Sequence, residues 1–138
     1  MKLLLDTHAA IWFVIDSKFL PGHSKNLIQN PDNECYVSTA TLWEMGIKHS
    51  LGKLKLKAEL KKIFELFFES GLILMPITPD HILTNASLPF HHRDPFDRLI
   101  IAQANFFWSR FFGAKREGYS IISKDQEFIN YDINVIWN

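Results

Sequence analysis

The segment KLLLDTHAAIWF, residues 2–13, determines the fold class of this chain. Its first four residues form a short, mostly apolar run with the length of a buried strand, and the run stops at an aspartate. A helix-like pattern begins directly afterwards, at Thr7. A buried strand that leads straight into a helix is typical of a parallel α/β sheet with helices on both faces.

The same succession recurs along the chain. We expect further strands at residues 34–38, 72–77, 119–123 and 134–137. We expect helices at residues 7–15, 24–29, 39–50, 58–70 and 126–131, and two more that open at Pro79 and Pro95. No repeat, linker or low-complexity tract interrupts this alternation, so residues 1–138 are expected to form a single domain.

The composition is typical of a globular protein, with 47% hydrophobic and 22% charged residues. The single cysteine, Cys35, excludes an internal disulfide and a thiolate cage for a metal ion. No apolar stretch has the length of a membrane span, and no signal-peptide cleavage site follows the N-terminus, so we expect a cytoplasmic protein. The net charge is zero, which gives no general attraction for a polyanion.

Four carboxylates stand where an apolar run ends or just inside the following helix: Asp6, Glu44, Asp97 and Asp125. In a parallel sheet the carboxyl ends of the strands share one edge, and ligands bind in the crevice there. We therefore expect the four acids to converge. Carboxylates held close together repel one another and take up protons, unless a hard divalent cation such as Mg²⁺ neutralises them. The acids therefore predict a divalent-metal site.

Each acid also has a purely structural explanation. Asp6 and Asp125 are placed to cap helices, and Glu44 follows Thr41 at the spacing of a capping box. Residues 94–97 read as an N-cap, a proline at the first helical position and an acid in the first turn. Capping explains each acid taken singly, whereas their coincidence at one inferred edge favours the metal site. The two roles are compatible, because helix N-termini favour anions.

Polar neighbours of the acids leave two interpretations open. The hydroxyls of Thr7 and Ser123 either orient the adjacent carboxylates or satisfy helix ends. Asp94 either binds a metal or caps the helix at Pro95, and its position favours the cap. His91 and His92 lack the spacing of a nitrogen-ligand site, so we expect them to face solvent or to contact phosphate.

Basic and aromatic residues cluster in separate segments. Six lysines lie between residues 48 and 62, and they either contact phosphate groups or form a solvated helix face. Residues 105–112, NFFWSRFF, carry more aromatic side chains than one helix face can bury in a small domain. This segment therefore predicts a second apolar surface, suited to a dimer contact or to a partner protein.

Several segments together resemble a known family: LLLDTHAAIWF, YVSTATLWEMGIKHSLGKL, MPITPDHI, LPFHHRDPFDRLIIAQA and ISKDQEFINYDINVIW. They are similar to a PIN domain, and specifically to the VapC-like ribonuclease toxins of bacterial type II toxin–antitoxin pairs. The resemblance implies a three-layer α/β/α sandwich with a central, mainly parallel sheet. It maps the family's acidic set onto Asp6, Glu44, Asp97 and Asp125, and the segment at residues 105–120 is longer than the family pattern.

The resemblance implies a Mg²⁺- or Mn²⁺-dependent endoribonuclease. Asp6 and Asp97 are the expected direct ligands, while Glu44 and Asp125 bind a second ion or act through water. A metal-activated water would leave a 5′-phosphate and a 3′-hydroxyl. The expected partners are the RNA substrate, a cognate antitoxin and a second copy of the chain. The candidates for holding the RNA backbone are Lys48, Lys53, Arg93 and Arg98.

Two other functions remain open from the sequence. One is a metal-dependent phosphohydrolase that acts on small phosphate esters. The other is a non-catalytic RNA- or protein-binding module in which all four acids are helix caps. Binding of a divalent metal ion would indicate the ribonuclease or the phosphohydrolase, whereas the non-catalytic module needs no metal site.

Overall fold

The computed structural model of the chain describes residues 1–105 and 118–138 and contains one central sheet. Five strands, all parallel, lie in the order β3-β2-β1-β4-β5. Their bounds are β1 Lys2–Leu5, β2 Glu34–Ser38, β3 Ile73–Met75, β4 Ser120–Ile122 and β5 Val135–Ile136. The expected parallel sheet is confirmed.

Helices follow the strands, as the sequence predicted. They are α1 Thr7–Val14, α2 Gly22–Gln29, α3 Thr39–Ser50, α4 Leu60–Glu69, α5 Pro79–Ser87, α6 Pro95–Ala104 and the 3₁₀ helix η1 Gln126–Tyr131. The bounds of α3 agree with the prediction to the residue, and those of α1, α2 and α4 differ by one or two residues. Within the described part of the chain, no helix has the length and apolarity needed to cross a membrane.

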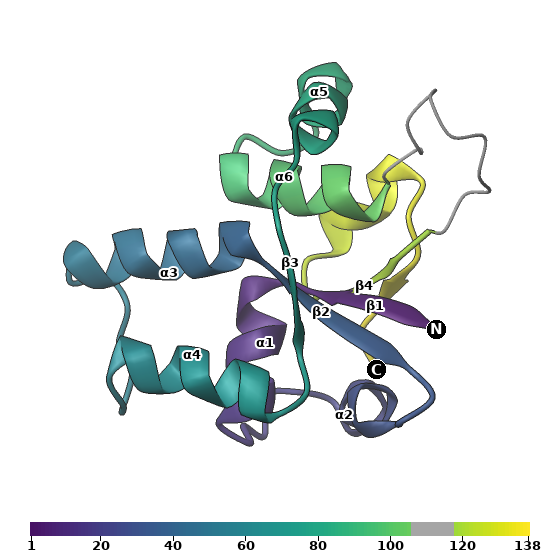
Figure 1. Cartoon of the computed structure of the whole chain (residues 1–138). Coiled ribbons are helices and arrows are strands. Elements are labelled where there is room, and N and C mark those ends of the chain that lie inside the picture. The colour runs from purple at the N-terminus through teal and green to yellow at the C-terminus, as the bar shows by residue number, and fades with distance from the viewer. Residues whose placement is uncertain (106–117) are drawn as a thin grey trace.

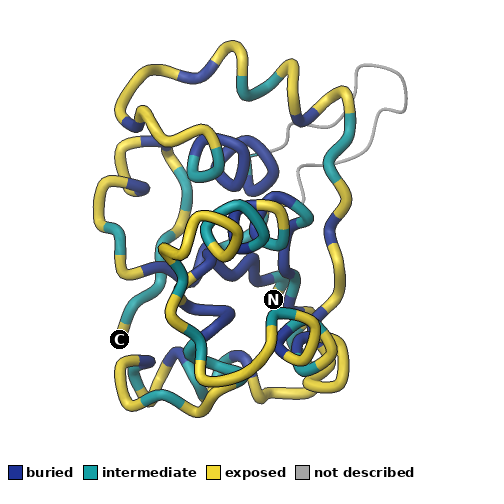
Figure 2. The backbone as a smooth tube through the Cα atoms, turned by 90° about the vertical axis from the view of Figure 1, so that its left-hand side faces the viewer, coloured by how far each residue is buried: buried dark blue, intermediate teal, exposed yellow. Residues whose placement is uncertain are grey.

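The helices form two layers, one on each face of the sheet (Figure 1). Leu3 and Leu5 point into a core with α1, α2 and α4, whereas Leu4 between them points into a second core with α6 and η1. Adjacent side chains of a strand point to opposite faces, so the three consecutive leucines of β1 serve both cores. Figure 2 shows the buried backbone at the centre, with exposed residues on the surrounding segments. The expected three-layer α/β/α sandwich is confirmed.

The order of the strands creates a crevice at one edge of the sheet. From β1 the chain adds β2 and then β3 on one side, and it later adds β4 and β5 on the other side. The strand order therefore reverses between β1 and β4, and ligands of open parallel sheets bind beyond the carboxyl ends at such a switch point. Asp6 follows β1, and Ser123 and Asp125 follow β4, so the fold brings these residues to this position.

Caps fix the helices that leave this edge. The carboxylate of Asp6 accepts from the N–H of Ala9 at 2.7 Å, and that of Asp125 accepts from the N–H of Glu127 at 2.9 Å. Asp94 accepts from two N–H groups in the first turn of α6, at 2.9 and 3.0 Å. The predicted capping roles of these three acids are therefore confirmed.

The capping box predicted for Thr41 and Glu44 is wrong. Helix α3 begins earlier, because the hydroxyl of Ser38 accepts from the N–H of Ala40 at 3.0 Å and makes Ser38 the N-cap. Glu44 therefore lies in the second turn, where its carboxylate is not needed by the helix end. At the other end, Gly52 takes the left-handed conformation with φ of +69°, as expected for the residue after a helix.

The aromatic segment singled out in the sequence falls mainly on residues 106–117, which lie outside the described residues. The second apolar surface predicted for it stays a prediction.

Candidate active site

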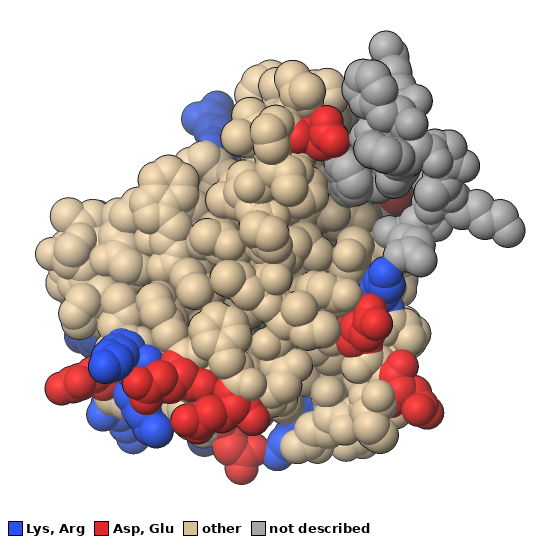
Figure 3. Space-filling model, in the orientation of Figure 1, with Lys and Arg blue, Asp and Glu red and all other residues tan. Residues whose placement is uncertain are grey.

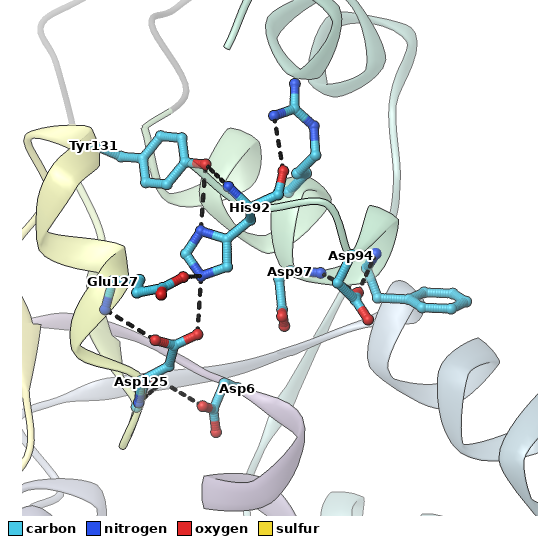
Figure 4. A network of polar contacts seen from close by, with 10 residues as sticks. Asp6, His92, Asp94, Asp97, Asp125, Glu127 and Tyr131 are labelled. Atoms are coloured by element: carbon cyan, nitrogen blue, oxygen red, sulfur yellow. Dashed lines mark hydrogen bonds and ion pairs between the residues drawn. The ribbon is translucent and has the colours of Figure 1, made fainter. Parts of the chain in front are cut away.

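An open cleft of 540 Å³ lies beyond the carboxyl ends of β1 and β4. The four acids expected to converge all line it, although they come from four separate segments. Figure 4 shows three of them, Asp6, Asp97 and Asp125, facing one another. The lining residues are Asp6, Thr7, His8, Trp12, Glu44, Lys48, Asp94, Asp97, Lys124, Asp125 and Phe128.

Asp6 is held rigidly at the floor of the cleft. One carboxylate oxygen caps α1, and the other accepts a hydrogen bond from the Ser123 hydroxyl. The side chain is almost completely buried, and this burial raises the pKa of the Asp6 carboxyl, although the bonds from Ser123 and Ala9 partly oppose the shift. Ser123 therefore orients the Asp6 carboxylate, which is one of the two roles considered for this hydroxyl.

Glu44 enters the cleft from the second turn of α3 and is 4% exposed. The hydroxyl of Thr7 donates to one carboxylate oxygen at 2.7 Å, and the ammonium of Lys48 lies 3.2 Å from the other. Thr7 thus orients Glu44 and not its neighbour Asp6. A buried carboxylate with two fixed partners keeps a single orientation towards the cleft.

Asp97, like Asp6, has a carboxyl whose pKa is raised. It lies in the first turn of α6, and burial raises the pKa of its carboxyl to about 7, with further contributions from the negative charges of Asp94 and Glu44. The pKa values of Asp6 and Asp97 thus shift in the direction expected for clustered carboxylates, although burial and not mutual repulsion is the largest cause. A group that resists ionisation in this way gains most from a cation placed beside it.

Asp125 has a partner that the sequence did not reveal. Nε2 of His92 lies 2.9 Å from one carboxylate oxygen of Asp125, and the other oxygen accepts from the N–H of Glu127 (Figure 4). The expectation that His92 faces solvent or phosphate is wrong, because this histidine is only 6% exposed. It packs against Phe128 and Tyr131, which the chain supplies 36 and 39 residues later.

The predicted basic residues do not all reach the cleft. Lys48 lines it, with 41% of its side chain exposed, and Lys124 joins it from the loop after β4, although the sequence had not indicated that lysine. Lys53 and Arg93 are exposed but lie outside the residues that line the cleft.

Arg98 has a structural role in the fold. It is 6% exposed, and its guanidinium donates to backbone carbonyls at the end of α5 and in the segment between α5 and α6. The acceptors are the carbonyls of Asn85, Leu88, Pro89 and His92, at 2.9 to 3.4 Å. These bonds hold the loop that carries His92, and they leave the guanidinium unavailable for a phosphate group.

The donor set of the cleft fits a hard divalent cation. Its facing ligands are carboxylate oxygens, which Mg²⁺ and Mn²⁺ prefer, and no thiolate is among the described residues that line the cleft. Burial raises the pKa of the Asp6 and Asp97 carboxyls, so their ionised forms are poorly solvated where the fold holds them. A divalent ion in the cleft would stabilise both carboxylates.

Comparisons with known proteins agree with this geometry. The family model described as the PIN domain matches residues 3–134. Among solved structures, the chain is similar to the crystal structure of VapBC2 from Rickettsia felis bound to a DNA fragment from their promoter. That match has a TM-score of 0.69 and 16% sequence identity, and it covers 100% of both chains, so it shows a shared fold. A comparison with curated proteins finds no match.

Proposed function

Because the chain belongs to the PIN domain family, we propose that it is a VapC-like toxin nuclease, a divalent-metal-dependent endoribonuclease that hydrolyses RNA phosphodiesters. The observation that carries the proposal is the convergence of Asp6, Glu44, Asp97 and Asp125 on one cleft at the switch point of the sheet. The likeness to the VapBC2 structure supports the toxin–antitoxin context.

Asp6 and Asp97 would hold the metal ion directly, with Glu44 and Asp125 completing the site or acting through water. Bound Mg²⁺ or Mn²⁺ supplies an activated water and stabilises negative charge on the phosphate and the leaving oxygen. The protein's own contribution is to fix the carboxylates before the substrate arrives. Ser123 and Thr7 do this for Asp6 and Glu44 through buried hydrogen bonds.

The RNA backbone is proposed to cross the cleft between its two lysines. Lys48 and Lys124 line it from α3 and from the loop after β4, and the ammonium of Lys48 lies beside the Glu44 carboxylate. A phosphate placed between a metal ion and these cations would be attracted from several sides. Lys53 and Arg93, both exposed, are candidates for phosphates further along the strand.

We also propose two protein partners. An antitoxin would cover the cleft and place an arginine among the carboxylates, where a charge-assisted pair competes with the metal ion. A second copy of the chain would cover the face shown in Figure 3, whose centre carries almost no charged side chains. Ile73 and Leu74 on the edge strand β3, and Ile82 and Leu83 on α5, are exposed and give this contact an apolar surface.

The proposal is tested by incubating the purified chain with RNA in the presence of Mn²⁺, Mg²⁺ or a chelator. We expect metal-dependent cleavage that leaves 5′-phosphate ends and that Asp97→Asn abolishes. Asp32→Asn is the matched control, because Asp32 is an exposed aspartate in the loop before β2, at the opposite edge of the sheet. Metal-independent cleavage, or cleavage that survives in Asp97→Asn, would refute the assignment.

The same preparation separates the two other functions. Hydrolysis of small phosphate esters with intact RNA would indicate the phosphohydrolase. RNA or protein binding without any calorimetric signal for Mn²⁺ would indicate the non-catalytic module, in which the acids serve as caps.

A further inference from the structure

A network of hydrogen bonds at the wall of the cleft joins side chains from three separate segments. It consists of His92 from the loop before α6, Asp125 from the loop after β4, and Tyr131 at the end of η1 (Figure 4). Of these three, only Asp125 lines the cleft. The other two are connected to the cleft through the contact of His92 with Asp125.

The directions of the hydrogen bonds follow from the groups involved. A carboxylate only accepts, so Nε2 of His92 carries the hydrogen of its 2.9 Å bond to Asp125. The Tyr131 hydroxyl accepts from the backbone N–H of His92 at 2.7 Å, and it lies 3.3 Å from Nδ1 of the ring. The imidazole is therefore held at both nitrogens and by its own backbone, with Phe128 packed against the ring.

This anchoring gives a second hold to a carboxylate that is otherwise fixed, among the described residues, only by its cap on η1. The Asp125 side chain is 38% exposed and sits on a short loop, so by itself it has several accessible orientations. The bond from His92 occupies one oxygen and the N–H of Glu127 occupies the other. Each carboxylate oxygen has about two lone pairs, so one on each remains for a ligand in the cleft.

The network also connects Asp125 to the floor of the cleft. The hydroxyl of Ser123 accepts from the backbone N–H of Asp125 at 3.0 Å and donates to the carboxylate of Asp6. A continuous path of hydrogen bonds thus runs from Tyr131 through His92 and Asp125 to Asp6. It joins the α6 loop to the ends of β1 and β4, three segments far apart in sequence.

We propose that His92 is a positioning residue that holds the Asp125 carboxylate in the orientation needed to receive a divalent cation, with Tyr131 holding the imidazole in turn. The inference rests on the proposed function, because it concerns the same cleft. It goes further by assigning a role to His92 and Tyr131, which do not line the cleft.

An alternative use of the same atoms is a separate metal site formed by His92, Asp125 and Glu127, whose candidate ligand atoms lie within 4.8 Å of one another. Two points favour positioning. With Asp125 ionised, Nε2 of His92 donates to it and offers no lone pair to a metal, and the Glu127 side chain is 67% exposed and 3.8 Å from Nε2. Mutation of Glu127 therefore distinguishes the positioning role of His92 from a separate metal site.

The test compares three variants by calorimetric titration with Mn²⁺. His92→Asn removes the donor at Nε2, and we expect affinity to fall ~10–100-fold, as for other residues that orient metal ligands. His92→Gln carries an amide nitrogen at about the position of Nε2, and we expect it to recover most of that loss. Glu127→Gln should bind Mn²⁺ as the unmodified protein does.

A measurement on the unmodified protein keeps the test independent of whether variants fold. In metal-free buffer, the His92 Nε2–H should give a slowly exchanging proton signal by NMR, and Asp125→Asn should shift it strongly. Tyr131→Phe retains the ring packing and removes the hydroxyl, so it should speed up exchange of that proton.

The outcomes distinguish this inference from the proposed function. Equal Mn²⁺ affinity in His92→Asn, His92→Gln and the unmodified protein would overturn the positioning role while leaving metal-dependent cleavage intact. A loss in Glu127→Gln as large as in His92→Asn would overturn it in favour of a separate metal site. Absence of RNA cleavage, together with the expected affinities and NMR signal, would instead remove the nuclease and leave the positioning role standing.

Discussion

Replacing Asp97 by asparagine should stabilise the metal-free protein at high pH. The pKa of Asp97 is raised from 3.8 to about 7, chiefly by burial and then by the charges of Asp94 and Glu44. The folded state therefore binds more protons than the unfolded state between these two pH values, and stability falls as the pH rises through that window. Above about pH 7 the loss of folding stability is complete. The Asp97→Asn variant avoids this loss because an amide of the same shape carries no charge.

The size of this stability difference follows from the two pKa values of Asp97. A rise from 3.8 to about 7 corresponds to about 4 kcal/mol at 1.36 kcal/mol per pH unit. Asp97 is partly exposed, so solvent screening reduces this to about 2 kcal/mol. In a domain of this size, that gain raises the melting temperature by roughly 6 °C.

The assay is urea and thermal unfolding of both proteins at pH 4 and pH 8 in a chelator, with Asp32→Asn as the control. We expect Asp97→Asn to be more stable at pH 8 and nearly equal to the unmodified protein at pH 4. Mn²⁺ at 100 times its dissociation constant should then stabilise the unmodified protein by about 2.7 kcal/mol and the variant by much less. If Asp97→Asn were no more stable at pH 8, and Mn²⁺ stabilised both proteins equally, the electrostatic account of the cleft would be wrong.

Three further predictions concern single residues. Lys48→Gln should weaken RNA binding and reduce the slope of log affinity against log salt by about 0.7, measured by fluorescence anisotropy in the Asp97→Asn background; an unchanged slope would place Lys48 away from phosphate. Arg98→Lys should lower the unfolding free energy by about 2 kcal/mol in urea, because an ammonium cannot reach all four carbonyls, and a loss below about 0.5 kcal/mol would argue against this role. Phe67→Ala should cost about 3–5 kcal/mol in the same assay, because Phe67 is completely buried between α4 and the sheet, and a much smaller cost would mean that the core closes over the cavity.

Local signals predicted most of the fold. The apolar run at residues 2–5, the helix from Thr39 and the proline at residue 95 each determine structure through neighbours in the sequence. The convergence of the four acids was also predictable, because parallel strands bring their carboxyl ends to one edge whatever their order. The capping role of Asp6 and Asp125 required no tertiary information either.

The residues that the sequence did not place correctly depend on contacts between distant segments. His92 reads as a surface residue by type, and only the packing of the α6 loop against η1 buries it. Arg98 is a more local exception, because its guanidinium is buried among backbone carbonyls that lie 6 to 13 residues earlier in the chain. Thr7 orients Glu44 across 37 residues, which no spacing rule indicates. Buried polar residues of this kind satisfy long-range partners, so they become visible only when the strand order is known.

The most direct test of the central claim is the anomalous scattering of Mn²⁺ in crystals of the metal-loaded protein. The account predicts a peak in the cleft, at about 2.0–2.3 Å from carboxylate oxygens of both Asp6 and Asp97, because hard divalent ions bind oxygen at about these distances. The same crystals of Asp97→Asn should show a weakened peak or none. A peak confined to His92 and Glu127, or none in the cleft at saturating Mn²⁺, would contradict the proposal that these carboxylates form the metal site.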